Sequence, residues 1–310
     1  MSGYAFLFPG QASQTVGMAR DLYEQHASVR ERFDQADEVL GFKLSEICFE
    51  GPEQRLMQTE VTQPAVFVHS VAVCELLSAE GFEPVAVAGH SLGEYSALVA
   101  AGALTFEAAL ALVGPRGKWM QVAGEQRPGA MGAVIGLEDD ARIESLCEQA
   151  AEVGVVVAAN FNAPGQVVVS GEQAAVLRLG ELVIEAGAKR FVELPVSGAF
   201  HSPLMQPAAE QMKALLQAAP LVAPRVPILS NVSAAPVIDP EQLRTHLIQQ
   251  ITSPVRWTET VRELVAMGVE RAYEVGPGTV LKGLLRRIER GLAVACVGTA
   301  EELAELKEAE

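Results

Sequence analysis

The stretch Pro84-Val-Ala-Val-Ala-Gly-His-Ser-Leu-Gly-Glu-Tyr-Ser-Ala-Leu98 decides how this chain is expected to fold. Residues 85–88 are a short apolar run containing β-branched side chains, which predicts a buried strand. Residues 94–101 are mostly helix formers, which predicts a helix. The turn between them reads Gly-His-Ser-Leu-Gly. Glycine on both sides of the serine permits a sharp, strained bend that lifts the Ser91 hydroxyl out of the sheet edge.

Two interpretations of Ser91 follow from these residues. A glycine-rich turn with a serine cap on the helix would need no chemistry. The strand before the turn and the helix after it favour a nucleophile instead. The peptide N–H of Leu92 would then point at a developing oxyanion from the positive end of the new helix.

Composition limits the class of protein. The chain has 310 residues, 49% of them hydrophobic, which is enough for one large domain or a domain with an insertion. A net charge of −16 argues against nucleic acid or an anionic membrane as the main partner. The four cysteines lack metal-ligand spacing and are expected to be buried thiols in a reducing cytosol. With no signal-peptide pattern and no run of about 18 apolar residues, we expect a cytoplasmic protein without a metal or a membrane span.

The first part of the chain alternates strand and helix. Residues 4–8 form a predicted strand that runs into Gln11, at the place where α/β sheets present ligand-facing loops. Helices are predicted over residues 18–40 and 59–77. Pro64 is expected in the first turn of the second helix, where proline is tolerated.

A further helix is predicted after the cap residue Thr105. Gly114-Pro115 is expected to interrupt it, because proline inside a helix costs about 3 kcal/mol. Arg116 follows directly. Its side chain is either a surface cation, which is the usual case, or a buried guanidinium that binds a carboxylate through two hydrogen bonds.

The order of predicted strands and helices changes in the middle of the chain. Strands and helices are predicted in the order β-α-β-β-α-β over residues 130–137, 139–152, 155–160, 166–170, 172–186 and 190–196. This order is the split βαβ arrangement of ferredoxin-like domains. We therefore predict a small domain of residues 125–197, inserted into a catalytic domain made of residues 1–124 and 198–310.

A serine nucleophile needs a base, and histidine is the usual one near neutral pH. His26 and His246 lie in polar helical stretches and are expected to be exposed. His69 lies beside core positions of a helix, and His90 should point away from the serine hydroxyl. His201 remains, because it lies in a glycine-containing loop at a strand end.

The acid of a Ser-His-acid triad has no clean candidate. In α/β-class serine hydrolases the chain order is serine, acid, histidine. The acids between Ser91 and His201 fall mostly in helices of the predicted insertion. Either the acid lies elsewhere or an uncharged group orients the imidazole.

Taken together, motifs along nearly the whole chain resemble the malonyl-CoA:acyl carrier protein transacylases of fatty acid synthesis. In chain order the motifs are Phe8-Pro-Gly-Gln-Ala-Ser-Gln14, Thr62-Gln-Pro64, Gly89-His-Ser-Leu-Gly-Glu-Tyr-Ser-Ala97, Arg116-Gly-Lys-Trp-Met-Gln121, Asn162-Ala-Pro-Gly-Gln-Val-Val-Val-Ser-Gly171, Ala199-Phe-His-Ser-Pro203, Asn231-Val-Ser-Ala234 and Tyr273-Glu-Val-Gly-Pro-Gly278. Each motif is weak alone, but the ordered set is specific. The resemblance implies an α/β fold with an α/β-hydrolase-like large domain and an inserted ferredoxin-like small domain.

The resemblance also implies catalytic roles. Ser91 would carry the malonyl group as an ester, and His201 would be the base. Gln11 and the Leu92 N–H would form the oxyanion hole. The backbone carbonyl of Gln250 would orient His201, which supplies an uncharged group in place of the missing acid.

For the substrate, the resemblance implies that Arg116 grips the malonyl carboxylate and that Gln63 and Gln166 line the pocket. Phe200 resembles the version that prefers malonyl, since methylmalonyl-using relatives tend to have serine there. No cofactor is implied. The partners would be malonyl-CoA and acyl carrier protein, and the protein is expected to be a monomer.

Carrier proteins are acidic, so a chain of net charge −16 needs a local basic patch for docking. The predicted basic patch consists of Lys189, Arg190, Lys282, Arg286 and Arg287. The plain alternative is a solvated helix face.

Three other functions remain open on the sequence. An esterase or thioesterase shares the serine turn but should have a proper acid and no carboxylate-binding Arg116. A non-catalytic protein that docks a carrier would form no ester at Ser91. The same transferase could also serve a polyketide synthase or a malonate decarboxylase.

Overall fold

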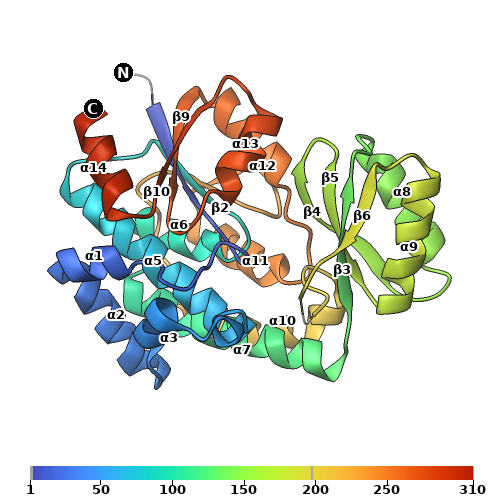
Figure 1. Cartoon of the computed structure of the whole chain (residues 1–310), viewed down its shortest axis with the longest axis horizontal. Helices are drawn as coiled ribbons and strands as arrows, with labels where there is room; N and C mark the ends of the chain where they lie inside the picture. The colour runs from blue at the N-terminus through green and yellow to red at the C-terminus, as the bar shows by residue number, and fades with distance from the viewer. Residues whose placement is uncertain (1–2, 197, 310) are drawn as a thin grey trace.

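The computed structural model describes residues 3–196 and 198–309, which contain two sheets (Figure 1). The strands are β1 (Gly3–Phe8), β2 (Ala86–Gly89), β3 (Ala130–Ile135), β4 (Val156–Ala163), β5 (Gln166–Gly171), β6 (Arg190–Glu193), β7 (Ile228–Leu229), β8 (Pro236–Val237), β9 (Val269–Val275) and β10 (Ala293–Val297). The expected domain limits at residues 1, 197 and 310 lie outside the described residues, so the domain boundaries stay a prediction.

Helices surround both sheets. They are α1 (Arg20–Gln25), α2 (Ala27–Leu40), α3 (Leu44–Glu50), α4 (Glu53–Leu56), α5 (Thr59–Ala79), α6 (Gly93–Ala100), α7 (Phe106–Gln126), α8 (Asp140–Ala150), α9 (Gln173–Glu185), the 3-10 helix η1 (Pro203–Met205), α10 (Gln206–Ala218), α11 (Pro240–Gln250), α12 (Trp257–Ala266), α13 (Val280–Ile288) and α14 (Ala300–Ala309).

The larger sheet has the strand order β10-β9-β1-β2-β7-β8, and only its edge strand β8 runs antiparallel to its neighbour. Strand β1 is buried on both faces. Phe6 and Phe8 point into the core formed with α5, α6 and α7, whereas Ala5 and Leu7 point into a second core with α12 and α13. This double burial explains why the strand is a continuous apolar run rather than an alternating one.

The smaller sheet is antiparallel, with the order β4-β5-β3-β6. Its strands thus stand in the ferredoxin-like order predicted from the sequence. Helices α8 and α9 cover one face, where Val134, Val167 and Val169 pack against them (Figure 1). Met131 and Val168 on the opposite face join the core of the larger sheet. The α/β fold class is therefore confirmed.

Three local expectations are wrong. The helix predicted over residues 18–40 is two helices, α1 and α2, because His26 between them is extended, with a φ of −119°. Helix α5 begins at Thr59, so Pro64 lies in its second turn rather than its first. Helix α7 runs without interruption through Pro115. The carbonyl that loses its donor there belongs to the exposed Ala111, so water can satisfy it.

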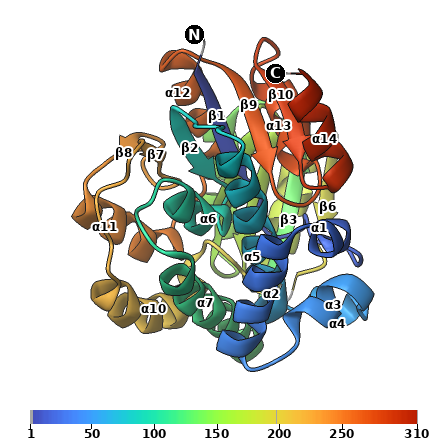
Figure 2. The ribbon, with the colours of Figure 1, turned by 90° about the vertical axis from the view of Figure 1, so that its left-hand side faces the viewer.

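Helix α5 is also long and apolar enough to cross a membrane, and 83% of its apolar window is buried within the protein. It packs beside α2 and α7, and Figure 2 shows these three helices together. A buried central helix has the same length and composition as a membrane span.

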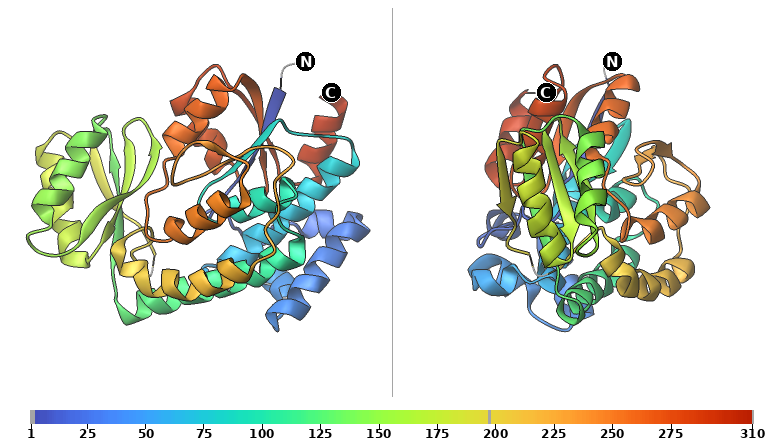
Figure 3. Two further views of the ribbon diagram at one scale, coloured as in Figure 1. Left: turned by 180° about the vertical axis from the view of Figure 1, so that it is seen from behind. Right: turned by 90° about the vertical axis from the view of Figure 1, so that its right-hand side faces the viewer.

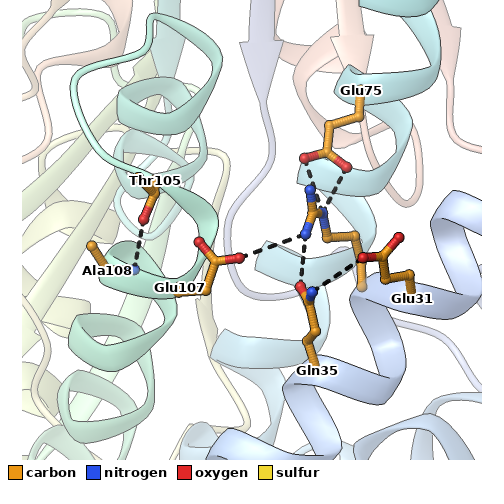
Figure 4. Close-up of polar contacts among 7 residues, drawn as sticks. Glu31, Gln35, Glu75, Thr105, Glu107 and Ala108 are labelled. Atoms are coloured by element: carbon orange, nitrogen blue, oxygen red, sulfur yellow. Dashed lines mark hydrogen bonds and ion pairs between the residues drawn. The ribbon is translucent and has the colours of Figure 1, made fainter.

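Arg32 on α2 contacts both α5 and α7, through Glu75 and Glu107, which are labelled in Figure 4. Its Nε donates to Glu75 Oε1 and Oε2 at 3.0 and 2.8 Å, and its Nη1 donates to Gln35 Oε1 at 2.7 Å. Nη1 also lies 3.7 Å from Glu107 Oε1, and the guanidinium stacks 5.0 Å above the Phe106 ring. The hydrogen bond to the Glu75 carboxylate raises the pKa of Arg32.

The segment after α11, residues 251–256, connects the two sheets. Val255 forms a parallel bridge with Asn160 on β4, and its carbonyl accepts from the Phe161 N–H at 2.9 Å. The Val255 N–H donates to Ala159 O at 2.8 Å. The linking segment therefore covers the open edge of β4, as the view from behind in Figure 3 also shows.

Candidate active site

Ser91 lies in the turn between β2 and α6 with a φ of +52°, a left-handed conformation that is rare outside glycine. The turn is tight. A Cβ at Gly89 would lie 1.9 Å from the Gly93 carbonyl carbon, so only glycine fits there. Two further non-glycine residues of positive φ, Ala12 and His201, line the same cavity. Backbone strain of this kind often gathers at functional sites.

The Ser91 hydroxyl contacts the predicted base. Ser91 Oγ lies 2.7 Å from His201 Nε2. On the other side of the ring, His201 Nδ1 lies 2.8 Å from the Gln250 carbonyl oxygen and 3.2 Å from that of Ser253. A carbonyl only accepts, so Nδ1 carries the proton and Nε2 is free to accept from the serine. Among the described residues, uncharged carbonyls thus occupy the place of a triad acid.

The His201 ring is 3% exposed. Burial, followed by repulsion from the Arg116 guanidinium, lowers the pKa of His201 to about 3. The imidazole is therefore neutral at physiological pH, which is the form that accepts a proton.

Arg116 is fully buried, so the surface-cation interpretation is wrong. From α7, its Nη1 donates to Gln63 Oε1 at 2.7 Å. Its Nη2 donates to Gln250 Oε1 at 3.0 Å and to Ser91 Oγ at 3.2 Å. The guanidinium also stacks over the Tyr95 ring at 5.5 Å, and burial lowers the pKa of Arg116 from its ordinary value. A buried cation with its fork beside the nucleophile suits a carboxylate ligand.

The sequence did not point to two side chains that hold the turn in place. Asn231 Oδ1 accepts from the Ser91 N–H at 2.7 Å, and Asn231 Nδ2 donates to Gly89 O at 2.7 Å. Gln250 Nε2 donates to Ser91 O at 2.9 Å and to Glu94 Oε2 at 2.6 Å. Asn231 opens one of the motifs of the family resemblance and follows a strand, but no role was assigned to its side chain.

The cavity beside Ser91 has a volume of about 220 Å³. Gln11, Leu92, Gln63, Gln166 and Phe200, each predicted from the sequence, line it. Gln11 lies in the turn after β1, and Leu92 immediately precedes α6. The structure thus brings the predicted catalytic and substrate-binding residues to one cavity, with Gln250 behind its wall.

Known proteins are similar to this chain along nearly its whole length. The acyl transferase domain family matches residues 5–303. The malonyl CoA-acyl carrier protein transacylase of Bacillus subtilis (strain 168) is 45% identical, over 98% of this chain and 96% of the relative. The chain belongs to the malonyl-CoA:acyl carrier protein transacylase family.

Solved structures of the transacylase family have the same fold. The enzyme of Xanthomonas oryzae pv. oryzae has a TM-score of 0.95 and 43% identity, covering 100% of this chain and 98% of that one. A malonyl-transacylase solved in complex with a type II polyketide acyl-carrier protein has a TM-score of 0.96 and 42% identity, and each chain is covered completely.

The other histidines of this transacylase family member lie away from the serine hydroxyl. His90 lines the same cavity, but its Nε2 bonds to Asn162 Oδ1 on β4 at 2.8 Å. His69 is buried, as expected of a core position. His26 and His246 are half-buried, so the prediction that they are exposed is wrong.

The predicted basic patch gathers around the turn between β4 and β5. Arg287 Nη1 donates to Gln166 Oε1 at 2.5 Å, at the rim of the cavity. Gln166, Ile135 and Arg190 follow one another across neighbouring strands. Arg287 of α13 and Arg190 of β6 thus lie near the same rim of the cavity. Lys189 and Arg286 are exposed, and Lys282 is half-buried.

Proposed function

We propose that this protein is an [acyl-carrier-protein] S-malonyltransferase that moves malonyl from malonyl-CoA to the phosphopantetheine thiol of acyl carrier protein, and so supplies fatty acid synthesis. The observation that carries the proposal is the 2.7 Å contact between Ser91 Oγ and His201 Nε2, beside the fully buried Arg116. A nucleophile, a base and a cationic fork on one cavity suit an acyl group that ends in a carboxylate. The family membership supports the same reaction.

In the first half-reaction, Ser91 Oγ attacks the thioester carbon while His201 Nε2 takes the hydroxyl proton. The oxyanion of the tetrahedral intermediate accepts from the Leu92 N–H and from Gln11, and each donor contributes about 3 kcal/mol. The carbon–sulfur bond then breaks. His201 returns the proton to the CoA thiolate, and malonyl remains as an ester on Ser91.

In the second half-reaction, the carrier's phosphopantetheine thiol enters after CoA has left. His201 takes the thiol proton as the sulfur attacks the ester carbon. The carbon–oxygen bond breaks, and the proton returns to Ser91 Oγ. This is ping-pong chemistry through a covalent intermediate.

His201 works here without an acid. A thiolate is a good leaving group, so the imidazole need only be held in the correct tautomer, which the carbonyls of Gln250 and Ser253 do. Repulsion from Arg116 is one cause of the low pKa of His201. A malonyl carboxylate on Arg116 offsets that repulsion and raises the pKa of His201. The base therefore becomes stronger when the correct substrate is bound.

Arg116 selects the substrate. A carboxylate matches a guanidinium in two parallel hydrogen bonds, whereas an acetyl group has no carboxylate oxygens to accept them. Phe200, 6% exposed on the cavity wall, limits the space around the acyl group and favours malonyl over a branched analogue.

One experiment tests the proposal directly. The intact protein is exposed to malonyl-CoA and its mass is measured, with Ser91→Ala as the control. We expect a malonyl adduct on the wild type only, and transfer of the adduct to added carrier thiol. Release of free malonate in place of transfer would make the protein an esterase. A wild type that acquires no adduct would remove the enzymatic proposal altogether.

The predicted basic patch is the proposed docking surface for the acidic carrier. Reversing Arg286 and Arg287 to Glu should raise the KM for carrier and leave the KM for malonyl-CoA unchanged. An unchanged carrier KM would remove this part. Steady-state assays with a fatty acid carrier and with a polyketide carrier, run side by side, identify the carrier that the protein serves.

The remaining parts of the proposal concern setting and organisation. We place the protein in the cytoplasm, as a monomer without a nucleic-acid or membrane partner. We assign residues 125–197 to the inserted small domain.

A further inference from the structure

Glu94 is a buried carboxyl group in the first turn of α6, with no role in the proposed reaction. It is 1% exposed. Its Oε2 accepts from Gln250 Nε2 at 2.6 Å, whereas Oε1 is buried and has no partner among the described residues. Buried polar atoms are almost always paired, and a buried carboxylate with an orphan oxygen calls for an explanation.

The Gln250 amide connects Glu94 to the substrate-binding cation. Its Oε1 accepts from Arg116 Nη2 at 3.0 Å, so the amide stands between the carboxyl group and the guanidinium. Within the described part of the chain, the titratable groups that act on Glu94 are Arg116, from α7, and the Tyr95 phenol, from its own helix. The other groups around it are uncharged, and hydrogen bonds from Gln250, the Asn231 backbone and Ser230 lower the pKa of Glu94 and so favour its ionised form. The buried site thus holds one cation and one carboxyl group, with the Gln250 amide between them.

Malonyl brings a second carboxylate to the same guanidinium. Two anions that share one cation in a buried site repel each other, and such pairs give up one charge by protonation. We propose that Glu94 takes up a proton from solvent when the malonyl carboxylate binds Arg116, so that the buried site keeps one negative charge throughout. This inference rests on the proposed function, and it makes Glu94 a positioning residue that balances charge.

The local geometry permits this protonation. Oε2 stays an acceptor for Gln250 whether or not the group is ionised, and the orphan Oε1 is free to carry the proton. Burial, the largest cause, raises the pKa of Glu94 to about 7, and the malonyl charge would raise it further. The chemical step itself consumes no proton, since the serine hydroxyl proton ends on the CoA thiol. A net uptake during ester formation therefore belongs to another group.

The experiment measures that proton. Wild type at about pH 7.5, in dilute buffer with an indicator dye, receives one equivalent of malonyl-CoA, and the ester is quantified by mass spectrometry. With a pKa of about 7, roughly three quarters of Glu94 is ionised beforehand, so uptake should approach 0.7 proton per ester. Glu94→Gln should lose this uptake. Glu125→Gln, which removes an exposed carboxylate on α7, should keep it.

The KM for malonyl-CoA provides a second readout. Because the bound state holds one more proton than the free state, the wild-type KM should rise with pH above about 7, by up to tenfold per pH unit. The Glu94→Gln profile should be flat over the same range, and the Glu125→Gln profile should follow the wild type. A purely structural role for Glu94 would shift KM without changing this slope.

Two results would overturn the inference: uptake by Glu94→Gln equal to that of wild type, or normal ester formation by wild type without uptake. Failure to form the ester at all would count against the proposed function instead. Should Glu94→Gln not fold, infrared difference spectra of wild type with ¹³C-labelled malonyl-CoA decide the matter. The ¹³C label shifts the carboxyl bands of the substrate away from those of the protein. An unlabelled protonated-carboxyl band supports the proposal, and its absence refutes it.

Discussion

Replacing Gly89 with alanine tests whether the tight turn, and not merely the presence of a serine, makes Ser91 reactive. The added Cβ would lie 1.9 Å from the Gly93 carbonyl carbon, 2.0 Å from its oxygen and 2.3 Å from the Glu94 nitrogen. All three are backbone atoms, so no side chain can swing aside. Reaching an ordinary contact of 3.4 Å requires the turn to open by about 1.5 Å.

Opening the turn would lengthen the hydrogen bond between the Ser91 hydroxyl and His201. Ser91 Oγ lies 2.7 Å from His201 Nε2, and a shift of about 1 Å in a reacting group costs roughly a hundredfold in rate. We expect Gly89→Ala to form the malonyl ester about a hundredfold more slowly, and to lose about 1–3 kcal/mol of stability from the overpacked turn.

The assay is quenched-flow mass spectrometry of ester formation, with rates normalised to the folded fraction from circular dichroism. Gly291→Ala is the matched control, because a Cβ there meets nothing within 4 Å. Ester formation by Gly89→Ala within about threefold of wild type, with an unchanged melting temperature, would refute the geometric reasoning for the turn.

Four further results are expected. Arg116→Ala should lower kcat/KM for malonyl-CoA by about 10²–10³ while changing that for acetyl-CoA far less, and equal losses would contradict carboxylate recognition. Since the neutral form of His201 is the base and its pKa is about 3, kcat/KM should stay level as pH falls from about 6.5 to about 5, and an inflection near 6.5 would disprove this. Arg32→Gln should reduce the free energy of unfolding in urea by about 1–2 kcal/mol, against less than about 0.5 for the exposed Arg20→Gln, and equal losses would contradict the bridging role. Gly283 is exposed in α13 with open space around it, so Gly283→Ala should raise the free energy of unfolding by about 0.5–1 kcal/mol, and a decrease would show strain at that position.

The fold was largely predictable because its signals are local. The β-α-β-β-α-β order of the small sheet follows from short apolar runs and turn residues, and each element forms near its expected place. Strands β8 and β10 and helices α3 and α4 were not predicted, because segments of two to seven residues carry too little periodicity. The expectations at Pro64 and Pro115 were wrong, since packing between α5 and α7 outweighs a local cost of about 3 kcal/mol.

From the residues alone only Ser91 and His201 could be proposed, and the other predicted members of the site came from the family resemblance. Ser91 stands in a recognisable turn, and His201 remained by elimination. The contact from Asn231 to Ser91 joins positions 140 residues apart, and that from Gln250 to Glu94 joins positions 156 apart. No local pattern encodes such pairs, because they depend on how strands and helices assemble.

The linking segment that covers β4 ends a few residues after the carbonyls that hold His201. Gln250 and Ser253 grip the imidazole, while Val255 is bonded to β4 of the small sheet. Only a short length of backbone separates these two sets of contacts. A change in the placement of one sheet against the other would therefore move the His201 imidazole, which takes the proton. Ser91 would not move with it, because Ser91 is held to the larger sheet through Gly89 and Asn231. The distance between Ser91 Oγ and His201 Nε2 therefore depends on how the small sheet is placed against the large one.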